Sequence, residues 1–78
     1  MSINFMEKLF SERLKLLRTA KGISQKQLGI ITNTSARTIQ SYELGDRLPG
    51  YECLIAIADA FDISLDYLVG RSDDPTRH

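Results

Sequence analysis

A short segment, residues 35–41, concentrates side chains that can contact the edge of a base pair. Arg37 suits two hydrogen bonds to guanine O6 and N7. Gln40 can pair with adenine or with a phosphate, and Ser35 and Ser41 are short hydroxyl donors suited to either partner. Ala36 adds a methyl group that can contact the methyl group of thymine. We therefore predict that Ser35, Ala36, Arg37, Gln40 and Ser41 read bases in DNA.

A second set of residues suits phosphate rather than bases. Gln25 is expected at the start of a helix, where free N–H groups and the helix dipole favour an anion. Lys26 and Arg47 are cations flanking the base-reading segment, and the Thr38 hydroxyl can also bind a phosphate. Any one of these residues alone is ordinary solvated surface. Their joint placement around one exposed helix predicts that Gln25, Lys26, Thr38 and Arg47 hold phosphates.

The base-reading segment is predicted to lie on the second of two capped helices. Ser24 and Gln27 form a capping box, so one helix is expected to start at Gln25 and to end near residue 32. Asn33 then permits a sharp turn, because asparagine accepts a positive φ. Ser35 is a good N-cap for the next helix, over residues 36–44. Two short helices joined by a sharp turn form a helix-turn-helix.

The apolar and small residues fit the same plan. Gly29 is small where the two helices must cross closely. The second helix places Leu28 and Ile31 on one side, and the third buries Ile39 and Tyr42. The opposite face of the third helix is then free, and a major groove about 12 Å wide accepts one α-helix.

Three further helices complete an all-α, compact five-helix bundle. Asn4 with Glu7 is expected to start the first helix, and Gly22 to end it. A loop follows at residues 45–50. A fourth helix carries an inner apolar stripe made of Leu54, Ile57, Ala58 and Phe61. Ser64 caps a brief fifth helix, ended by Gly70, whose inner residues are Leu65, Leu68 and Val69. Residues 1–9 are expected to extend the first helix, residues 10–70 to form the DNA-binding domain, and residues 71–78 to be a flexible tail.

The composition excludes several classes of protein. The 78 residues, 42% of them hydrophobic, allow one small domain without a deep catalytic cleft. One cysteine (Cys53) and one histidine (His78) cannot form an internal disulfide or a zinc site, so we expect no metal and no cofactor. Cys53 fits a small apolar filler, and His78 is expected to be disordered. No apolar run approaches the ~18 residues of a membrane helix, and residues 1–10 lack the features of a secretion signal. A cytoplasmic protein is the expectation.

The net charge is zero, but the charges are unevenly distributed. Residues 1–49 hold eight basic and four acidic residues, whereas residues 50–78 hold two basic and six acidic ones. Such a molecule can present a positive face to phosphate while its other end stays acidic. Chance clustering of solvated charges explains the pattern about equally well, so charge alone does not decide for nucleic acid.

The sequence resembles the Cro/repressor-type (Xre) helix-turn-helix family over roughly residues 10–70. The resemblance is carried by Arg13-Leu14, Leu17-Arg18, Lys21-Gly22-Ile23-Ser24-Gln25, Leu28, Ser35, Thr38-Ile39, Tyr42-Glu43, Gly45, Pro49, Leu54, Ile57-Ala58 and Ile63-Ser64-Leu65-Asp66-Tyr67-Leu68.

This resemblance implies a five-helix DNA-binding fold of the phage-repressor kind, usually dimeric on a two-fold operator. It also implies that Gln25 grips a phosphate, and that the positions of Ser35, Ala36, Arg37 and Ser41 face bases. A structural ion pair between Arg18 and Glu43 is implied as well.

The chain departs from the family pattern around the turn. The family usually has glycine at the position of Asn33, and often has apolar residues at the positions of Thr32 and Thr34, so the turn is expected to be less tightly packed. Position 36 is often a polar reader. Because Ala36 removes one hydrogen-bonding option, base specificity is expected to depend more on Arg37.

The first helix is more apolar than one core face requires. Met6, Phe10, Leu14 and Leu17 project in one direction. A second set, Phe5, Leu9, Leu16 and Ala20, projects about 100° away. Part of this surface could bind a partner, as could Ile55 or the fifth helix with Leu65 and Val69. The alternative is a wide core stripe covered by the N-terminal segment with Ile3. We expect a homodimer, because one short helix reads few bases.

Sequence-specific DNA binding in transcription regulation, most simply repression, is the leading interpretation. The alternative is a protein-interaction module of the same fold, either an antitoxin-like protein or a bridging factor. An enzyme is not expected, because the sequence offers no glycine-rich phosphate loop, metal cluster or nucleophile–base pair. The expected partners are double-stranded DNA and a second copy of the chain, with no membrane and no metal.

Overall fold

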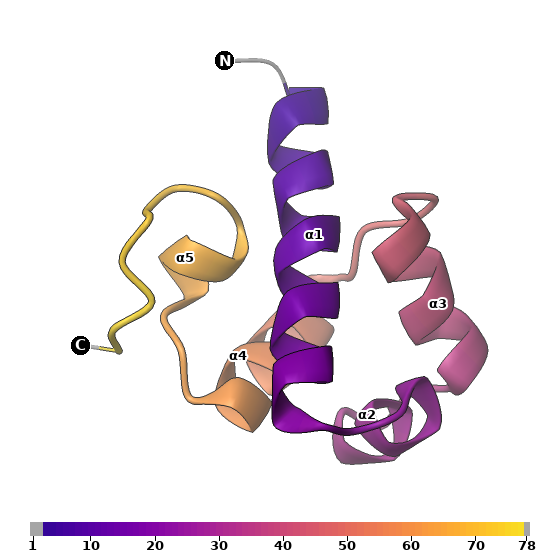
Figure 1. Ribbon diagram of the computed structural model, residues 1–78. Coiled ribbons are helices and arrows are strands. Elements are labelled where there is room, and N and C mark those ends of the chain that lie inside the picture. The colour runs from indigo at the N-terminus through magenta and orange to yellow at the C-terminus, as the bar shows by residue number, and fades with distance from the viewer. Residues whose placement is uncertain (1–2, 78) are drawn as a thin grey trace.

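A computed structural model describes residues 3–77 as five α-helices around one core, without a strand in that range. The helices are α1 (Ile3–Lys21), α2 (Gln25–Ile31), α3 (Ala36–Leu44), α4 (Tyr51–Phe61) and α5 (Leu65–Leu68). In Figure 1, α1 stands in front of the bundle, with α3 on one side and α5 on the other. This arrangement confirms the predicted all-α, five-helix fold. His78, which was expected to be disordered, lies outside the described residues.

Local sequence signals account for most helix ends. The Ser24 side chain accepts a hydrogen bond from the Gln27 N–H, and the Gln27 side chain accepts one from the Ser24 N–H, which completes the predicted capping box. Ser64 caps α5 by accepting from the Tyr67 N–H. The predicted start of α1 is wrong, because Asn4 lies inside a helix that already includes Ile3. No glycine or proline interrupts residues 3–9, so nothing local stops the helix at Asn4.

All five helices contribute to one core. Its buried apolar residues are Phe10, Leu14, Leu28, Ile39, Tyr42, Ile57, Ala58, Ile63 and Leu68. The rings of Phe10 and Tyr42 meet edge to face, with centroids 6.3 Å apart and an interplanar angle of 68°. Such aromatic pairs add about 0.5–1.5 kcal/mol beyond the burial of their area. The inner side of α3 is thus fixed against α1 by a defined contact.

Two residues predicted to be inside are on the surface. Ile31 is 53% exposed and Leu65 is 38% exposed. On α2 the inner position four residues after Leu28 belongs to Thr32, which is buried and whose hydroxyl donates to the Leu28 carbonyl oxygen at 2.8 Å. Helix α5 is a single helical turn, so only one of its sides can face the core, and Leu68 occupies that side.

The second apolar set on α1 faces outward. Phe5 is 52% exposed, Leu16 is 63% exposed, and Ala20 is also exposed. Leu9 is half-buried against Gly70, where an added Cβ would lie 3.1 Å from the leucine Cδ2. The bundle therefore covers one side of α1 and reaches Leu9 at its edge, whereas Leu16 and Ala20 lie on the exposed side.

Residues that follow α5 return to the bundle. The buried Arg13 guanidinium donates to the carbonyl oxygens of Tyr67 and Ser72, the latter at 2.8 Å, and to the Asp73 carboxylate at 2.8 Å. It also lies over the Tyr67 ring, 4.0 Å from the centroid. Arg77 pairs with Asp59 at 2.7 Å. These contacts give residues 71–77 a defined path, and the flexibility of this segment stays a prediction.

Candidate nucleic-acid interface

The close crossing of α2 and α3 depends on Gly29. A Cβ at this position would lie 2.9 Å from the Ser35 carbonyl carbon and 3.1 Å from the Ala36 nitrogen. Both atoms belong to the backbone and cannot move aside as a flexible side chain could. A glycine is therefore required if α3 is to start this close to α2.

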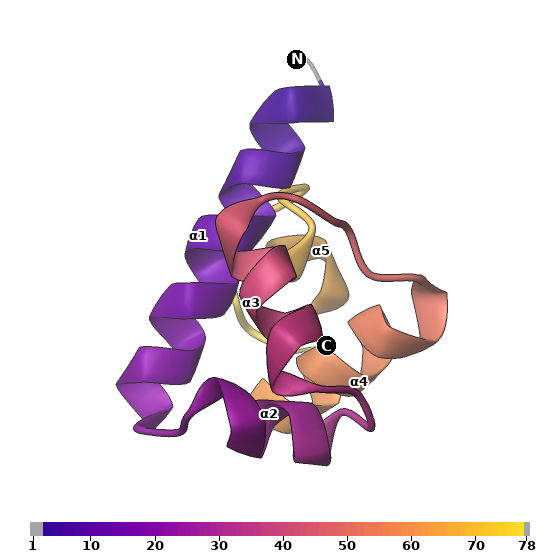
Figure 2. The same ribbon diagram turned by 90° about the vertical axis from the view of Figure 1, so that its right-hand side faces the viewer.

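The turn between the two helices has the predicted geometry. Asn33 has φ 59°, in the left-handed region that asparagine tolerates better than most residues. The Thr34 N–H donates to the Gly29 carbonyl oxygen at 2.7 Å, which closes the end of α2. Together with Gly29, this turn fixes the direction in which α3 leaves α2, as Figure 2 shows from the α3 side.

The outward face of α3 carries the principal predicted base readers. Arg37 and Gln40 are exposed, and Ser41 and Ala36 are half-buried at its edges. Ile39 and Tyr42, on the other side of the helix, are 0% and 5% exposed. The helix thus presents a polar outer side that no other described segment covers (Figure 2). Base reading by these residues stays a prediction.

At the N-terminus of α3, two hydroxyl groups are already engaged. The Ser35 Oγ accepts from the Thr38 N–H at 3.1 Å and lies 2.9 Å from the Thr38 Oγ1. Either hydroxyl can donate in that pair. Ser35 therefore serves first as the N-cap of the helix. Only its remaining lone pair or its hydroxyl proton is available for a hydrogen bond with DNA.

A buried ionic cluster links α1, α2 and α3. Arg18 donates to both Glu43 carboxylate oxygens, at 2.5 and 3.1 Å, and also to the Ile23 carbonyl oxygen at 2.9 Å. The side chains of Arg18 and Glu43 are 14% and 4% exposed. The hydrogen bond from Glu43 raises the pKa of Arg18, against an opposing effect of burial. Arg18 therefore stays charged, and its contacts tie α3 to α1 at the end opposite to Ser35.

The same cluster holds one predicted phosphate ligand. The Gln25 Nε2 donates to Glu43 Oε1 at 3.1 Å, so the orientation of this amide is set by the carboxylate. The Gln25 backbone N–H lies in the first turn of α2, where helix N–H groups have no intrahelical partner. Lys26 and Arg47 are both exposed, on α2 and on the loop after α3. Both cations are thus free of cover in the structure, and their contact with phosphate stays a prediction.

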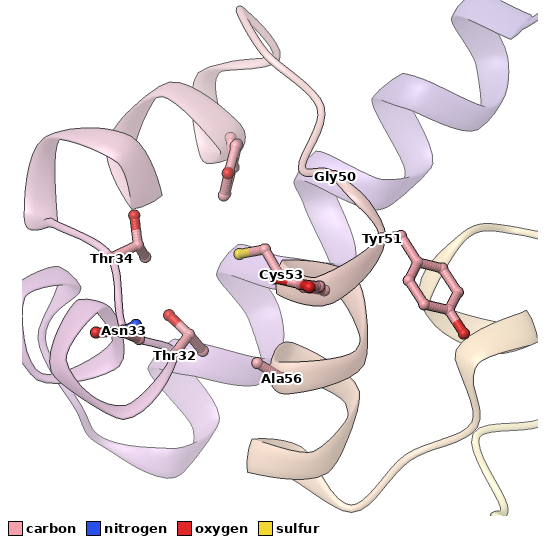
Figure 3. A pocket seen from close by; sticks show the side chains of 9 residues that line it. Thr32, Asn33, Thr34, Gly50, Tyr51, Cys53 and Ala56 are labelled. Atoms are coloured by element: carbon pink, nitrogen blue, oxygen red, sulfur yellow. The ribbon is translucent and has the colours of Figure 1, made fainter.

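A hollow of about 720 Å³ lies between the turn and the start of α4. Thr32, Asn33 and Thr34 line one side, and Gly50, Tyr51, Cys53 and Ala56 line the other (Figure 3). Half-buried Cys53 packs against the core and also lines this hollow.

The pKa of the Tyr42 phenol is raised, chiefly by burial and secondly by a hydrogen bond with Cys53. The phenol therefore stays neutral at physiological pH and links α3 to α4.

Two features of the site were missed in the sequence. Glu43 was expected only as the partner of Arg18, and its second contact with Gln25 joins residues 18 positions apart that no local pattern connects. Leu44 is 67% exposed on α3 and falls seven residues after Arg37, on the same side of the helix. The seven-residue spacing from Arg37 is the sequence signal that could have placed Leu44 on this side of α3.

Among residues 3–77, no helix combines the length and apolar character needed to cross a membrane. Within the same range, no group of three or more His, Cys, Asp or Glu side chains could hold a metal ion.

A sequence model described as helix-turn-helix matches residues 14–68. The chain therefore belongs to the helix-turn-helix family, of the Cro/repressor (Xre) type that its residues resemble. It is 39% identical over 67 residues to the uncharacterized HTH-type transcriptional regulator YqaE of Bacillus subtilis (strain 168), covering 85% of this chain and 58% of that protein. It is 42% identical over 60 residues to the cryptic phage CTXphi transcriptional repressor RstR of Vibrio cholerae, covering 77% of this chain and 54% of that protein. The chain thus spans little more than half of these relatives.

Solved structures share the fold. The P22 c2 repressor in complex with a synthetic operator matches 82% of this chain and 97% of its own, with a TM-score of 0.79 and 31% identity. The restriction-modification controller protein C.AhdI from Aeromonas hydrophila matches 87% of this chain and 99% of its own, with a TM-score of 0.77 and 29% identity.

Proposed function

We propose that this chain is a sequence-specific DNA-binding transcriptional regulator, acting as a repressor, that inserts α3 into the major groove. The observation that carries the proposal is the outward face of α3, where Arg37 and Gln40 are exposed while Ile39 and Tyr42 lie in the core. Side chains near the N-terminus of such a helix reach base edges in a groove about 12 Å wide. The base-reading set is Ser35, Ala36, Arg37, Gln40 and Ser41.

Phosphate contacts would then position the protein on the duplex without reading sequence. Gln25, Lys26, Thr38 and Arg47 are the proposed ligands. Support comes from the first turn of α2, whose N–H groups favour an anion, and from the exposed cations on α2 and in the loop after α3. The P22 c2 repressor, which shares the fold, has been solved in complex with a synthetic operator.

Because one short helix reads few base pairs, the proposed active form is a homodimer on a two-fold symmetric operator. Two-fold dimers place their reading helices about 34 Å apart, which is one turn of DNA. Sedimentation at micromolar concentration in the presence of operator tests this directly. A species of one chain per DNA would contradict the dimer.

Selection of bound fragments from random DNA, at a stated salt concentration, tests the proposed function. We expect an enriched sequence with two inverted half-sites, because a two-fold dimer requires a palindrome. A variant with Arg37→Ala and Gln40→Ala should enrich no such sequence while remaining folded by circular dichroism. Failure of the unaltered protein to enrich any sequence would refute sequence-specific binding.

A further inference from the structure

A small pocket lies between α1 and the start of α4, where the loop over residues 45–50 leaves α3 beside α1 and runs to α4 (Figure 2). Its volume is about 250 Å³. The lining residues are Met6, Glu7, Phe10, Leu48, Pro49, Leu54 and Val69. None of these seven belongs to α2 or α3. This apolar pocket is therefore separate from the proposed base readers and phosphate ligands.

The walls of the apolar pocket are held in place by the fold. Phe10 is 2% exposed and belongs to the core, Pro49 is buried, and Leu54 packs against the core. The Val69 N–H donates to the Leu65 carbonyl oxygen at 3.0 Å, which fixes the end of α5. Because these residues also support the bundle, the pocket cannot close unless helices move. A preformed, mostly apolar hollow with one polar group is typical of a site for a small molecule.

That polar group is Glu7, the one charged residue among those that line the apolar pocket. Its backbone carbonyl oxygen accepts from the Ser11 hydroxyl at 3.1 Å. Its carboxylate makes no hydrogen bond or ion pair within residues 3–77, although the side chain is on a half-buried residue. A carboxylate that is partly removed from water gains from a cation placed beside it. The pocket thus combines an apolar wall with an unmatched negative charge.

We propose that the apolar pocket binds a small apolar molecule that carries a protonated amine. The apolar body contacts Phe10 and Leu54, and the ammonium group lies beside the Glu7 carboxylate. If each non-hydrogen atom takes about the ~30 Å³ share of one water molecule, 250 Å³ holds roughly eight atoms. This size fits an arylalkylamine or a short alkylamine and is too small for a helix or strand of another protein.

This binding activity goes beyond the proposed function and does not depend on it. The helix-turn-helix match covers residues 14–68, so Met6, Glu7, Phe10 and Val69 lie outside it. The pocket is therefore a feature of this chain that the DNA-binding plan does not require. Leu48 directly follows Arg47, so an occupied pocket would lie next to a proposed phosphate ligand without using its side chain.

Titration of the whole chain with 2-phenylethylamine, followed by NMR without DNA, tests the proposal. We expect saturable shifts centred on Phe10, Leu48, Leu54 and Val69, with a dissociation constant in the millimolar range because the ligand is small. The uncharged analogue 2-phenylethanol should bind about two- to fivefold more weakly, since it lacks the contact with the Glu7 carboxylate. Phenylacetate should bind more weakly still, because its charge has the same sign as that of Glu7.

Two pairs of variants separate the charge from the apolar wall. Glu7→Gln should abolish the preference for the amine over the alcohol and leave the affinity for the alcohol unchanged. Glu12→Gln is its matched control, because Glu12 is exposed on the same helix and does not line the apolar pocket. Leu48→Ala should weaken the amine and the alcohol by the same factor. Leu44→Ala, at a residue that is 67% exposed and outside the pocket, should weaken neither.

Several results would overturn the proposal. These are the absence of saturable shifts at about 10 mM amine, shifts centred on other residues, phenylacetate binding as well as the amine, or a preference for the amine that survives Glu7→Gln. Pocket signals that move with protein concentration when no amine is present would assign the pocket to a second copy and overturn the proposal as well. Circular dichroism checks that each variant remains folded. Because no measurement uses DNA, a failure here leaves the proposed function standing, and a failure to bind DNA leaves this result standing.

Discussion

Replacing Gly29 with alanine tests whether the close approach of α2 and α3 is needed for the fold. The added Cβ would lie 2.9 Å from the Ser35 carbonyl carbon, 3.1 Å from the Ala36 nitrogen and 3.2 Å from the Ser35 Cα. All three atoms belong to the backbone, so relief of the clash requires the start of α3 to move. Inserting a methyl group into a packed site costs about 1–3 kcal/mol.

Alanine also favours the helix over glycine, which opposes this cost by about 1 kcal/mol. Because only backbone atoms are in the way, the cost should lie in the upper part of that range, about 2–3 kcal/mol, so we expect Gly29→Ala to lower the free energy of unfolding by about 1–2 kcal/mol. For a domain of this size, the melting temperature should fall by roughly 5–15 °C. The affinity for operator DNA should fall by more than the increase in unfolded protein alone would cause. The reason is that α3, which carries the proposed base readers, has to move to relieve the clash.

Urea unfolding and a thermal scan followed by circular dichroism measure the effect. Ile30→Ala is the matched control, since Ile30 follows Gly29 on α2 and is 70% exposed. This substitution should change the free energy of unfolding by no more than about 0.5 kcal/mol. If Gly29→Ala were as stable as the unaltered protein and bound operator equally well, the steric argument for this position would be refuted.

Four further predictions concern the DNA contacts and the buried groups. Arg37→Ala should weaken operator binding by about 1–3 kcal/mol and relax preference at one base pair; equal losses on operator and random DNA in titrations would remove Arg37 from the base readers. Lys26→Ala should weaken both DNAs alike and reduce the slope of log K against log salt by about 1, and an unchanged slope would exclude a phosphate contact. Glu43→Ala should cost about 3–5 kcal/mol in urea unfolding, because Arg18 keeps a buried charge without its carboxylate; a loss under about 1 kcal/mol would contradict this reading. Tyr42 has a raised pKa in the folded state, chiefly through burial, so its protonated phenol stabilises the fold below the unfolded pKa of about 10 and this contribution disappears as pH rises through the folded pKa. Tyr42→Phe should therefore flatten the alkaline loss of stability measured by urea unfolding, and an unchanged pH profile would show that another group causes it.

The sequence predicts features that depend on a few neighbouring residues. The capping box of α2, the positive φ of Asn33 and the N-cap Ser35 were all predicted, and the structure confirms them. Each depends on hydrogen bonds or backbone sterics within three or four residues. Gly29 was also predicted, because a helix-turn-helix requires one small residue at its crossing.

Features that depend on contacts between elements distant in the sequence could not be predicted from neighbouring residues. Ile31 fits the apolar period of α2 but faces solvent, because the turn brings Thr32 inward instead. Arg13 reaches Asp73, 60 positions away, and nothing local connects the two. The assignment of individual base readers depends on the position of DNA relative to α3, so it stays a prediction.

Internal pairing changes what the basic residues of the N-terminal half can do. Arg13 and Arg18 are buried with their own carboxylate and carbonyl partners, and Lys21 donates to the Ala60 carbonyl oxygen at 3.0 Å. Fewer cations than the amino-acid count suggests are therefore free to displace counterions from a duplex. We expect a shallow ionic-strength dependence and little long-range steering, so that the chain would dissociate readily from most of a genome and remain only where α3 finds matching bases.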